Sequence, residues 1–289
     1  NQDFWNDKFS KKYKVFLFYL YDYVNFSNKK ISEIINSKIT ELNIDVVLFE
    51  GDHVSSIDFN FINLINNSVK KGLFLGDDSV WHQVNLITAA ACDFVLTDPV
   101  SSFKFNEIGI NSIFSTIEGN EDIFKDYKKK KDIDILFFGR DKTDRNQYLE
   151  KLDKSNIKYL SVNPYLEIAN TIEKLAILIN RSKIVVNVTK SLNGKRFFNP
   201  SSKFKYGYYF KGRIIMTGLC NTLCISEYAP SNEILYPNKE LPSFKTKDEF
   251  IKIVKGYLND NHKLIKDTKT FYEKSLEYSD KNYIEKIYE

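Results

Sequence analysis

Cationic side chains in the second half of the sequence could bind an anion. A planar guanidinium can hold a phosphate through two parallel hydrogen bonds, and phosphates also accept backbone N–H groups at a helix N-terminus. Several cations follow the apolar run Asp134–Phe138, and two flank Gly212. The cations concerned are Arg140, Lys142, Arg145, Lys211 and Arg213. Arg140, Lys142 and Arg213 could bind a phosphate, and the alternative is that they are surface cations paired with carboxylates.

Acidic and imidazole side chains in the first half could take a proton from a hydroxyl group. Asp77 and Asp78 follow one predicted strand, His53 follows another, and Asp52 and His82 lie in similar positions. Histidine titrates near neutral pH, which suits a general base. Such residues are also common helix caps, as Asp78 or Ser79 would be here. Both interpretations stay open.

Short β-branched and aromatic runs alternate with amphipathic segments along the chain, which predicts βαβ units with parallel sheets covered on both faces. The predicted strands are Lys14–Tyr19, Asp45–Glu50, Gly72–Gly76, Asp93–Thr97, Ser112–Ser115, Asp134–Phe138, Lys158–Val162, Lys183–Val188 and Thr222–Ser226. The predicted helices are Lys29–Leu42, Phe59–Lys70, His82–Ala90, Asn146–Asn156, Thr171–Asn180 and Lys203–Met216.

The polar stretch Asn120–Asp132 lacks apolar periodicity and separates two sets of elements. We therefore predict an N-terminal Rossmann-like domain over residues 1–125, a second over 132–275 and a terminal helix over 276–289. Thr246 and Glu249 form a capping box that begins a further helix. Doubly wound sheets bind ligands at the carboxyl ends of their strands, and two facing domains form a cleft.

The composition argues against several classes of protein. The 289 residues carry 42 Lys and Arg against 38 Asp and Glu, so the basic run Lys128–Lys131 predicts a solvated loop rather than a nucleic-acid site. No apolar run is long enough to span a bilayer, and the start does not look like a signal peptide. The three cysteines predict reduced thiols in the cytoplasm, and Cys220 and Cys224 lack the partners of a zinc site. The dinucleotide fingerprint GxGxxG is absent.

A set of ordered motifs resembles one family. The motifs are Asp134–Gly139, the later Arg145, Ser182-Lys183-Ile184, Lys211-Gly212-Arg213 and Ser226-Glu227-Tyr228. Their order and spacing resemble the CgeB-like (spore-maturation-protein-like) branch of the GT-B glycosyltransferases over most of residues 132–275. Looser similarities in the first half are Asp45–Phe49, Gly76-Asp77-Asp78, Cys92–Asp98 and Gly109-Ile110. The resemblance implies the GT-B fold, with two Rossmann-like domains facing across a cleft.

The resemblance also implies a function. A sugar would pass from a nucleotide-sugar donor to a glycan, lipid or protein acceptor, as in polysaccharide biosynthesis. Arg213 would grip the donor diphosphate, together with the other cations and Asn187, while Glu227 and Tyr228 would contact ribose or sugar hydroxyls. A carboxylate suits this role because it accepts two vicinal donors. The base would be among Asp77, Asp78 and His53. Such enzymes hold the diphosphate with protein groups, so we expect neither metal nor cofactor.

The main alternative is a catalytically inactive GT-B-like module that binds nucleotides or glycans. The family commonly has a Glu three residues after the helix Arg, where this sequence has Met216. Asp3–Lys12 is predicted as the helix that follows the family's first strand, so that strand is expected to be missing or to lie outside this sequence. Another protein of two Rossmann-like domains, of periplasmic-binding or epimerase type, is the third alternative. Peripheral membrane association and the oligomeric state stay open.

Overall fold

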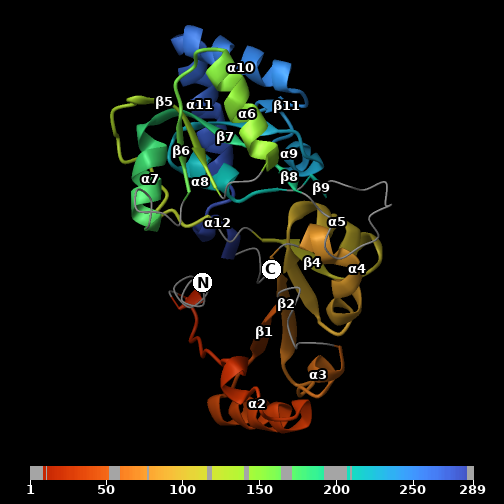
Figure 1. The fold of residues 1–289 in the computed structure, drawn as a ribbon. Coiled ribbons are helices and arrows are strands. Elements are labelled where there is room, and N and C mark those ends of the chain that lie inside the picture. Colours follow the sequence, from red (N-terminus) through yellow and green to blue (C-terminus); the bar gives the residue numbers. More distant parts are fainter. Residues whose placement is uncertain are drawn as a thin grey trace. The chain divides into compact units, whose positions relative to one another are not determined.

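The computed structural model describes residues 9–10, 12–51, 59–76, 78–115, 119–139, 143–163, 171–191, 207–208 and 210–284. Internal contacts divide the chain into two compact units, the first within residues 1–115 and the second within residues 116–287. Each unit is built on its own parallel sheet (Figure 1).

The first unit contains a sheet of four parallel strands in the order β1-β2-β3-β4. The strands are β1 (Val46–Gly51), β2 (Lys70–Leu75), β3 (Phe94–Thr97) and β4 (Ser112–Phe114). The helices are the 3-10 helix η1 (Leu20–Tyr23) and α2 (Asn28–Leu42), α3 (Phe59–Asn63), α4 (Asp78–Ala89) and α5 (Pro99–Glu107). Each strand pairs with the next strand in the sequence, so the predicted βαβ pattern is confirmed for these elements.

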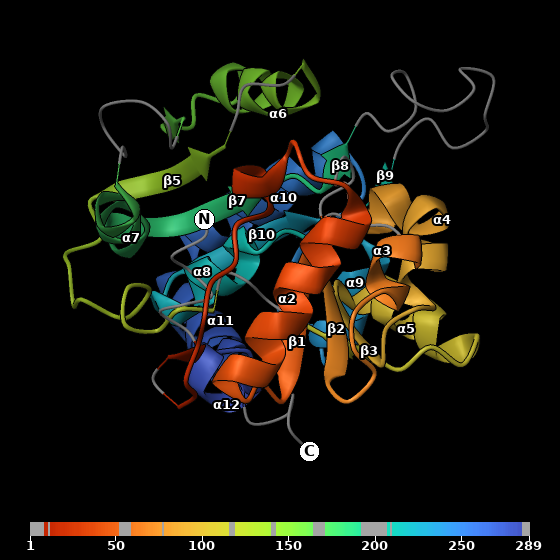
Figure 2. The same cartoon turned by 90° about the horizontal axis from the view of Figure 1, so that it is seen from below.

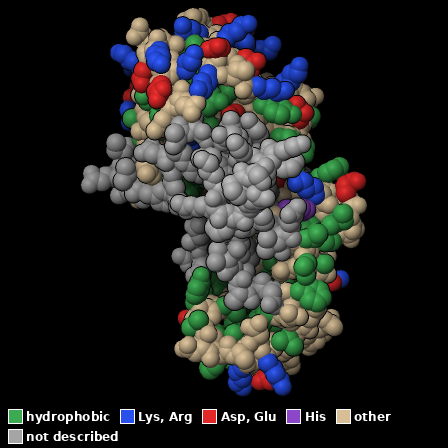
Figure 3. Space-filling view, turned by 45° about the vertical axis from the view of Figure 1, so that its right-hand side comes forward, with side chains coloured by type: hydrophobic (Ala, Val, Ile, Leu, Met, Phe, Trp, Pro, Cys, Tyr) green, Lys and Arg blue, Asp and Glu red, His purple; other side chains and the backbone are tan. Residues whose placement is uncertain are grey.

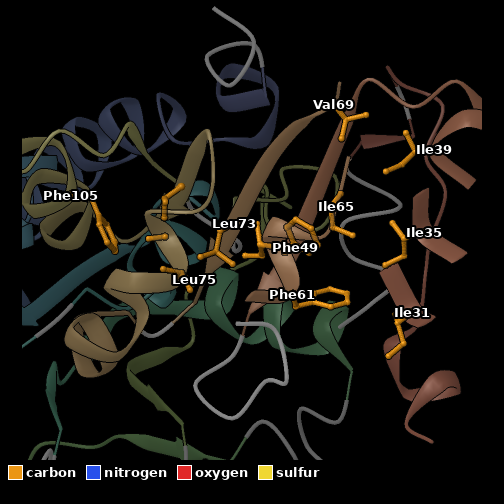
Figure 4. Close-up of a cluster of buried hydrophobic side chains, with 13 residues drawn as sticks. Ile31, Ile35, Ile39, Phe49, Phe61, Ile65, Val69, Leu73, Leu75 and Phe105 are labelled. Carbon is orange, nitrogen blue, oxygen red and sulfur yellow. The ribbon is translucent and has the colours of Figure 1, made fainter. Parts of the chain in front are cut away.

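The core of the first unit joins α2 and the other helices to the sheet. Ile31, Ile35 and Ile39 recur every four residues, which places them on one face of the helix, and all three are buried. They belong to the same cluster as Phe49 of β1 and Phe61 of α3, whose rings meet edge to face at 6.3 Å (Figure 4). Figure 2 shows α2 running in front of β1.

The predicted strand Lys14–Tyr19 is wrong. These residues pair with no strand, and Phe16 and Leu17 remain 42% and 41% exposed. An apolar run suits a strand, but a strand also needs a neighbour whose backbone completes its hydrogen bonds. The pattern of apolar residues does not show whether such a neighbouring strand is present.

The helix predicted over Phe59–Lys70 is too long, because α3 ends at Asn63. Ile65 and Val69 are buried as expected, but they lie in the turn that leads into β2. The side chain of Asn36 on α2 holds this turn: its amide donates to the Leu64 carbonyl oxygen (2.9 Å), and its oxygen accepts the Asn66 N–H (2.8 Å). A side chain 28 residues earlier thus satisfies backbone groups that a helix would otherwise have used.

The second unit contains a five-stranded parallel sheet in the order β11-β10-β7-β5-β6. Its strands are β5 (Ile133–Phe138), β6 (Leu160–Val162), β7 (Ser182–Asn187), β10 (Leu223–Glu227) and β11 (Ser243–Phe244). Its helices are α6 (Thr143–Lys154), α7 (Ile172–Arg181), α8 (Arg213–Leu219), α9 (Pro230–Leu235), α10 (Lys247–Asn259), α11 (Asn261–Leu276) and α12 (Asp280–Ile284). A separate antiparallel pair joins β8 (Lys190–Ser191) to β9 (Gly207–Tyr208).

The helix predicted over Lys203–Met216 is wrong in its first part. Gly207 and Tyr208 form β9, and α8 begins only at Arg213. Lys211 and Gly212 therefore precede the helix instead of lying inside it. The predicted capping box is confirmed, since Thr246 and Glu249 satisfy each other's backbone N–H groups at the start of α10.

Helices α8 and α11 approach each other closely at Gly218. A Cβ at this glycine would overlap the Ser275 side chain and lie 3.3 Å from the Phe271 ring. Ser275 and Phe271 are both fully buried, and the Ser275 hydroxyl donates to the Phe271 carbonyl oxygen (2.7 Å). Only a residue without a side chain fits here, so Gly218 sets the distance between the two helices.

The two ends of the described part of the second unit meet. The Asp280 N–H donates to the Gly119 carbonyl oxygen (2.8 Å), and Lys281 forms an ion pair with Glu121 (3.2 Å). The segment that follows Gly119 is fastened to α7, because the Asn180 side chain accepts the Tyr127 N–H (2.7 Å) and donates to the Lys125 carbonyl oxygen (2.9 Å). The polar stretch 120–132 thus packs against the second unit.

Lys131 lies near the end of that polar stretch and has a largely buried ammonium group. It donates to the Asn221 carbonyl oxygen (3.1 Å) and to the Thr222 hydroxyl (2.5 Å). Burial lowers the pKa of Lys131 from 10.5 to about 8. The charged form is disfavoured in the folded state, because burial removes its hydration.

We expect the stability of the wild type, relative to Lys131→Met, to rise with pH between about 8 and 10.5. In that window the unfolded chain keeps the proton that the folded chain has released, and the state that binds fewer protons gains stability as pH rises. At 1.36 kcal/mol per pKa unit, the gain is at most about 3 kcal/mol. Urea unfolding of both proteins at pH 7, 8, 9 and 10 measures it.

The control is Lys128→Met, whose side chain is 84% exposed. A hydrogen bond to Asp126 raises the pKa of Lys128, so this residue titrates above the window. The difference in free energy of unfolding between Lys128→Met and the wild type should stay constant across the same pH values. If the difference in free energy of unfolding between Lys131→Met and the wild type is also independent of pH, the prediction is contradicted.

The surface of the second unit carries charges of both signs (Figure 3). On α10 and α11 the exposed acidic residues Asp248, Glu249 and Glu273 accompany a larger number of exposed lysines. The exposed lysines are Lys252, Lys255, Lys263, Lys266 and Lys269. Within the described residues, no helix is both long and apolar enough to cross a membrane.

Candidate functional site

The carboxyl ends of three adjacent strands in the second sheet carry the polar residues of interest. In the register of β7 and β10, Asn187 lies opposite Ser226, which precedes Glu227. In the register of β5 and β7, Phe137 lies opposite Val186, so β5 ends beside Asn187. Neighbouring strands are about 4.8 Å apart, and Glu227 is therefore about 10 Å, or two strands, from the end of β5.

Two guanidinium groups converge on Gly139, the residue that follows β5. Gly139 has φ +145°, a conformation that L side chains rarely adopt. A Cβ there would overlap Nη1 of Arg145 and lie 3.1 Å from Nη1 of Arg213. The bare backbone of Gly139 thus makes room for both cations at the end of the strand.

Each arginine is held in place by β5. Arg213, the first residue of α8, donates from Nη1 to the Phe138 carbonyl oxygen (2.9 Å) and lies 5.6 Å from the centre of the Phe138 ring. Arg145, on α6, is 6% exposed and lies 5.7 Å from the centre of the Phe137 ring. Two positive charges close together favour an anion between or beside them, and guanidinium groups match the geometry of phosphate.

Glu227 is the last residue of β10 and is only 3% exposed. The Tyr148 hydroxyl donates to Oε1 (2.9 Å), and the Thr189 hydroxyl lies 3.3 Å from Oε2. These hydrogen bonds offset the cost of burying a carboxylate. The predicted strand Thr222–Ser226 stops one residue before Glu227, whereas Glu227 is part of β10 and is buried among polar groups.

Asn187 is fully buried at the end of β7. Its amide nitrogen donates to the Ser226 hydroxyl (2.8 Å), and that hydroxyl donates to the Glu227 carbonyl oxygen (2.8 Å). Among the described residues, its Oδ1 atom has no hydrogen-bond partner. A buried acceptor normally has a partner, so this atom is suited to receive a ligand donor.

Lys211 and Tyr228 lie at the edge of this arrangement. Lys211 is half-buried just before α8, where its carbonyl oxygen accepts the Ile214 N–H (3.0 Å). The N–H of Tyr228 donates to the Phe244 carbonyl oxygen (2.8 Å), and Lys245 lies 4.3 Å from the centre of the Tyr228 ring. Both side chains are partly exposed, so a ligand can reach them.

Several predicted residues lie outside the described part of the chain. These residues are His53, Asp52, Asp77, Arg140 and Lys142. Asp78 begins α4, but its side chain is not described, and the ring of His82 packs 4.5 Å from that of Phe105. The general base and two of the predicted phosphate ligands therefore stay predictions.

Two other kinds of site would need a nucleophilic thiol or a cluster of metal ligands. Burial raises the pKa of the Cys92 and Cys220 thiols to about 12 and also raises that of Cys224, which disfavours the nucleophilic thiolate. Within the described ranges, no group of three or more His, Cys, Asp or Glu side chains could hold a metal ion.

Tyr148 and Thr189 were missed from the sequence. Tyr148 follows Arg145 by three residues, so both lie on the same face of α6. This spacing could have indicated that Tyr148 lies near the site. However, a tyrosine on an apolar helix face fits a position in the core equally well. Its contact with Glu227, 79 residues away, is visible only in the structure.

Residues 119–278, more than half of the chain, match the family model described as glycosyl transferase-like. The chain belongs to this family. The glycosyl transferase-like match covers the whole sheet of the second unit, including Gly139, Asn187, Arg213 and Glu227. It confirms the predicted family at this level. The family is one of sugar-transferring enzymes, which favours sugar transfer over an inactive module.

Solved structures agree with the predicted fold. Sucrose-phosphate synthase from Thermosynechococcus elongatus is 10% identical, with a TM-score of 0.58 over 90% of this chain and 76% of its own. A glycosyltransferase from Rickettsia africae is 14% identical, with a TM-score of 0.58 over 98% and 86%. A putative UDP-N-acetylglucosamine 2-epimerase from Listeria monocytogenes is 11% identical, with a TM-score of 0.55 over 90% and 77%.

At these identities the similarity concerns the fold alone, and it confirms the predicted α/β class of GT-B type. The glycosyl transferase-like chain spans less than three fifths of several other structural neighbours. No curated protein matches the sequence.

Proposed function

We propose that this glycosyl transferase-like chain moves a sugar from a nucleotide-sugar donor whose diphosphate binds beside Gly139. The convergence of Arg145 and Arg213 on this glycine carries the proposal. During transfer the bond between the anomeric carbon and the diphosphate oxygen breaks, and negative charge develops on the departing nucleoside diphosphate. Positively charged groups fixed at that position stabilise the developing charge without reorganising.

The ribose of the donor would lie toward Glu227, about two strand spacings from Gly139. A carboxylate accepts hydroxyl donors such as those of a ribose, and Asn187 offers a further acceptor between Glu227 and Gly139. The same edge of one sheet thus provides a cationic end and a hydroxyl-accepting end. This arrangement matches the two polar parts of a nucleoside diphosphate.

The remaining parts of the proposal concern chemistry outside the described site. The acceptor would be a glycan, lipid or protein, and its hydroxyl would lose its proton to Asp77, Asp78 or His53. No metal would be needed, because the two guanidinium groups supply the charge. Membership of the CgeB-like branch and a cytoplasmic location belong to the same proposal.

A second candidate is a GT-B-like module that binds nucleotides without transferring sugar. Met216 is the observation behind this candidate, because the family resemblance leads one to expect a Glu at that position of α8, whereas the family match favours transfer. Nucleotide binding is common to both candidates, so turnover has to separate them. The epimerase alternative differs in that its product is a free or nucleotide-linked sugar with no acceptor.

Calorimetric titration of the chain with UDP, GDP, ADP, CDP and dTDP tests the proposal. We expect one of these nucleotides to bind with micromolar affinity, and to bind equally well in EDTA. Release of that nucleotide from its sugar conjugate, with sugar appearing on an added acceptor, would support transfer. Binding without release would favour the inactive module, and no binding of any nucleotide would overturn both.

A further inference from the structure

The hydroxyl of Tyr148 makes a buried hydrogen bond to Glu227, the acidic residue of the site. Its oxygen lies 2.9 Å from Oε1 of Glu227, and the two residues are 7% and 3% exposed. A hydrogen bond to a carboxylate is stronger than one between neutral groups, and water cannot replace it easily at this depth. The orientation of Glu227 therefore depends on Tyr148.

Thr189 is the weaker of the two hydroxyl donors. Its oxygen lies 3.3 Å from Oε2 of Glu227 but also 3.2 Å from the Tyr228 carbonyl oxygen. One hydroxyl has a single proton, so the two acceptors compete for it. Tyr148 makes the shorter bond to the carboxylate.

Tyr148 is itself held firmly. Its ring packs against Phe244 at 5.3 Å and edge to face against Phe250 at 5.4 Å. Phe244 on β11 is the residue that pairs with Glu227 on β10. The tyrosine therefore rests on the strand next to the residue that it contacts, and three elements fix its position.

Helix α6 links this contact to the cationic end of the site. Arg145 and Tyr148 are three residues apart on α6 and are both buried. One helix thus presents a guanidinium to Gly139 and a hydroxyl to Glu227. A shift of α6 would move both ends of the proposed nucleotide site together.

We propose that Tyr148 is a positioning residue that orients the Glu227 carboxylate to accept the 2′-hydroxyl of the donor ribose. The proposal rests on the proposed function, because it assumes that a nucleoside diphosphate binds at this edge. A carboxylate offers about four lone-pair positions. With Tyr148 on one oxygen and Thr189 near the other, the carboxylate is fixed in direction, so a ligand hydroxyl has to approach it with a set orientation.

The test compares ribonucleotides with 2′-deoxyribonucleotides. The affinities of UDP, GDP, ADP and CDP, and of their 2′-deoxy counterparts, are measured by calorimetry for the wild type, Tyr148→Phe and Glu227→Gln. For the wild type, the deoxy form should bind about tenfold more weakly, because it leaves a buried acceptor without a donor. The ratio of the ribonucleotide affinity to the deoxyribonucleotide affinity measures the contribution of the 2′-hydroxyl. Tyr148→Phe keeps the ring and should reduce this ratio at least threefold, with little change in the affinity of the deoxy form.

The control is Tyr236→Phe, which removes a hydroxyl that lies 3.1 Å from Ser275, a residue of α11. Tyr236 is 2% exposed, so this variant has a similar effect on the core but should keep the wild-type ratio. Tyr148→Phe with an unchanged ratio would overturn the positioning role while leaving the proposed function intact. Equal affinities of the wild type for the ribonucleotide and its 2′-deoxy form would also overturn the positioning role. If none of the nucleotides binds the wild type, the proposed function fails and the role of Tyr148 fails with it.

Discussion

Arg213→Ala should weaken the binding of the preferred nucleoside diphosphate at least tenfold. A hydrogen bond between charged groups contributes about 1.5–3 kcal/mol, and about 1.4 kcal/mol is a factor of ten in affinity. The bond from Nη1 of Arg213 to the Phe138 carbonyl oxygen fixes the direction of the guanidinium at the end of β5. Calorimetry at constant salt concentration measures the change.

Two further variants sharpen this test. Arg213→Lys keeps the charge but loses the planar fork, and its affinity should fall between those of the wild type and the alanine variant. Arg181→Ala removes a guanidinium on α7 that is paired with Asp132 (2.6 Å), and it should leave affinity unchanged. Equal affinity of the wild type and Arg213→Ala, in a folded protein, would remove Arg213 from the phosphate site.

Gly218→Ala should destabilise the second unit by about 2 kcal/mol or more. The added methyl group overlaps Ser275, and overpacking a dense core costs about 1–3 kcal/mol and sometimes more. The neighbours cannot move aside easily, because Ser275 and Phe271 are fully buried. Alanine favours a helix over glycine by about 1 kcal/mol, which offsets part of the loss. Thermal unfolding followed by circular dichroism measures the result.

Gly256→Ala provides the matched control. Gly256 lies within α10, and a Cβ added there would meet no atom within 4 Å apart from its chain neighbours and the backbone of its own helix, so the helix preference of alanine acts alone. This variant should stabilise the protein by about 0.5–1 kcal/mol. Combining Gly218→Ala with Ser275→Gly should restore part of the stability, since both of the closest atoms belong to Ser275. A Gly218→Ala variant as stable as Gly256→Ala would show that α8 and α11 can separate without cost.

Most strands of the two sheets could be predicted because each is a short apolar run between polar residues. The runs that became β1, β2, β3, β5, β7 and β10 all end within two residues of the predicted positions. Lys14–Tyr19 has the same composition but no pairing partner. Phe59–Lys70 has helical spacing, yet Asn36 stabilises a turn there instead. In both cases residues far away in the sequence decide the local structure.

The candidate site was predictable in part for the same reason. Parallel strands bring their carboxyl ends to one edge, so Asn187 and Glu227 could be expected to lie near the residues that follow β5. The contact between Tyr148 and Glu227 could not, because it depends on how far α6 lies from the sheet. The convergence of Arg145 and Arg213 depends equally on Gly139 adopting a positive φ, which no residue spacing reveals.

The contact between Gly119 and Asp280 has a consequence for engineering. When the two ends of a folded unit lie side by side, the unit can be cut out, inserted into another protein or joined end to end and reopened elsewhere. A circular permutant that links residue 284 to residue 119 through a short flexible peptide, with new ends in a loop, would keep the spatial order of the strands in the second sheet. It would also present the nucleotide site proposed here free of the first unit, as a portable binding module for measuring donor recognition apart from acceptor chemistry.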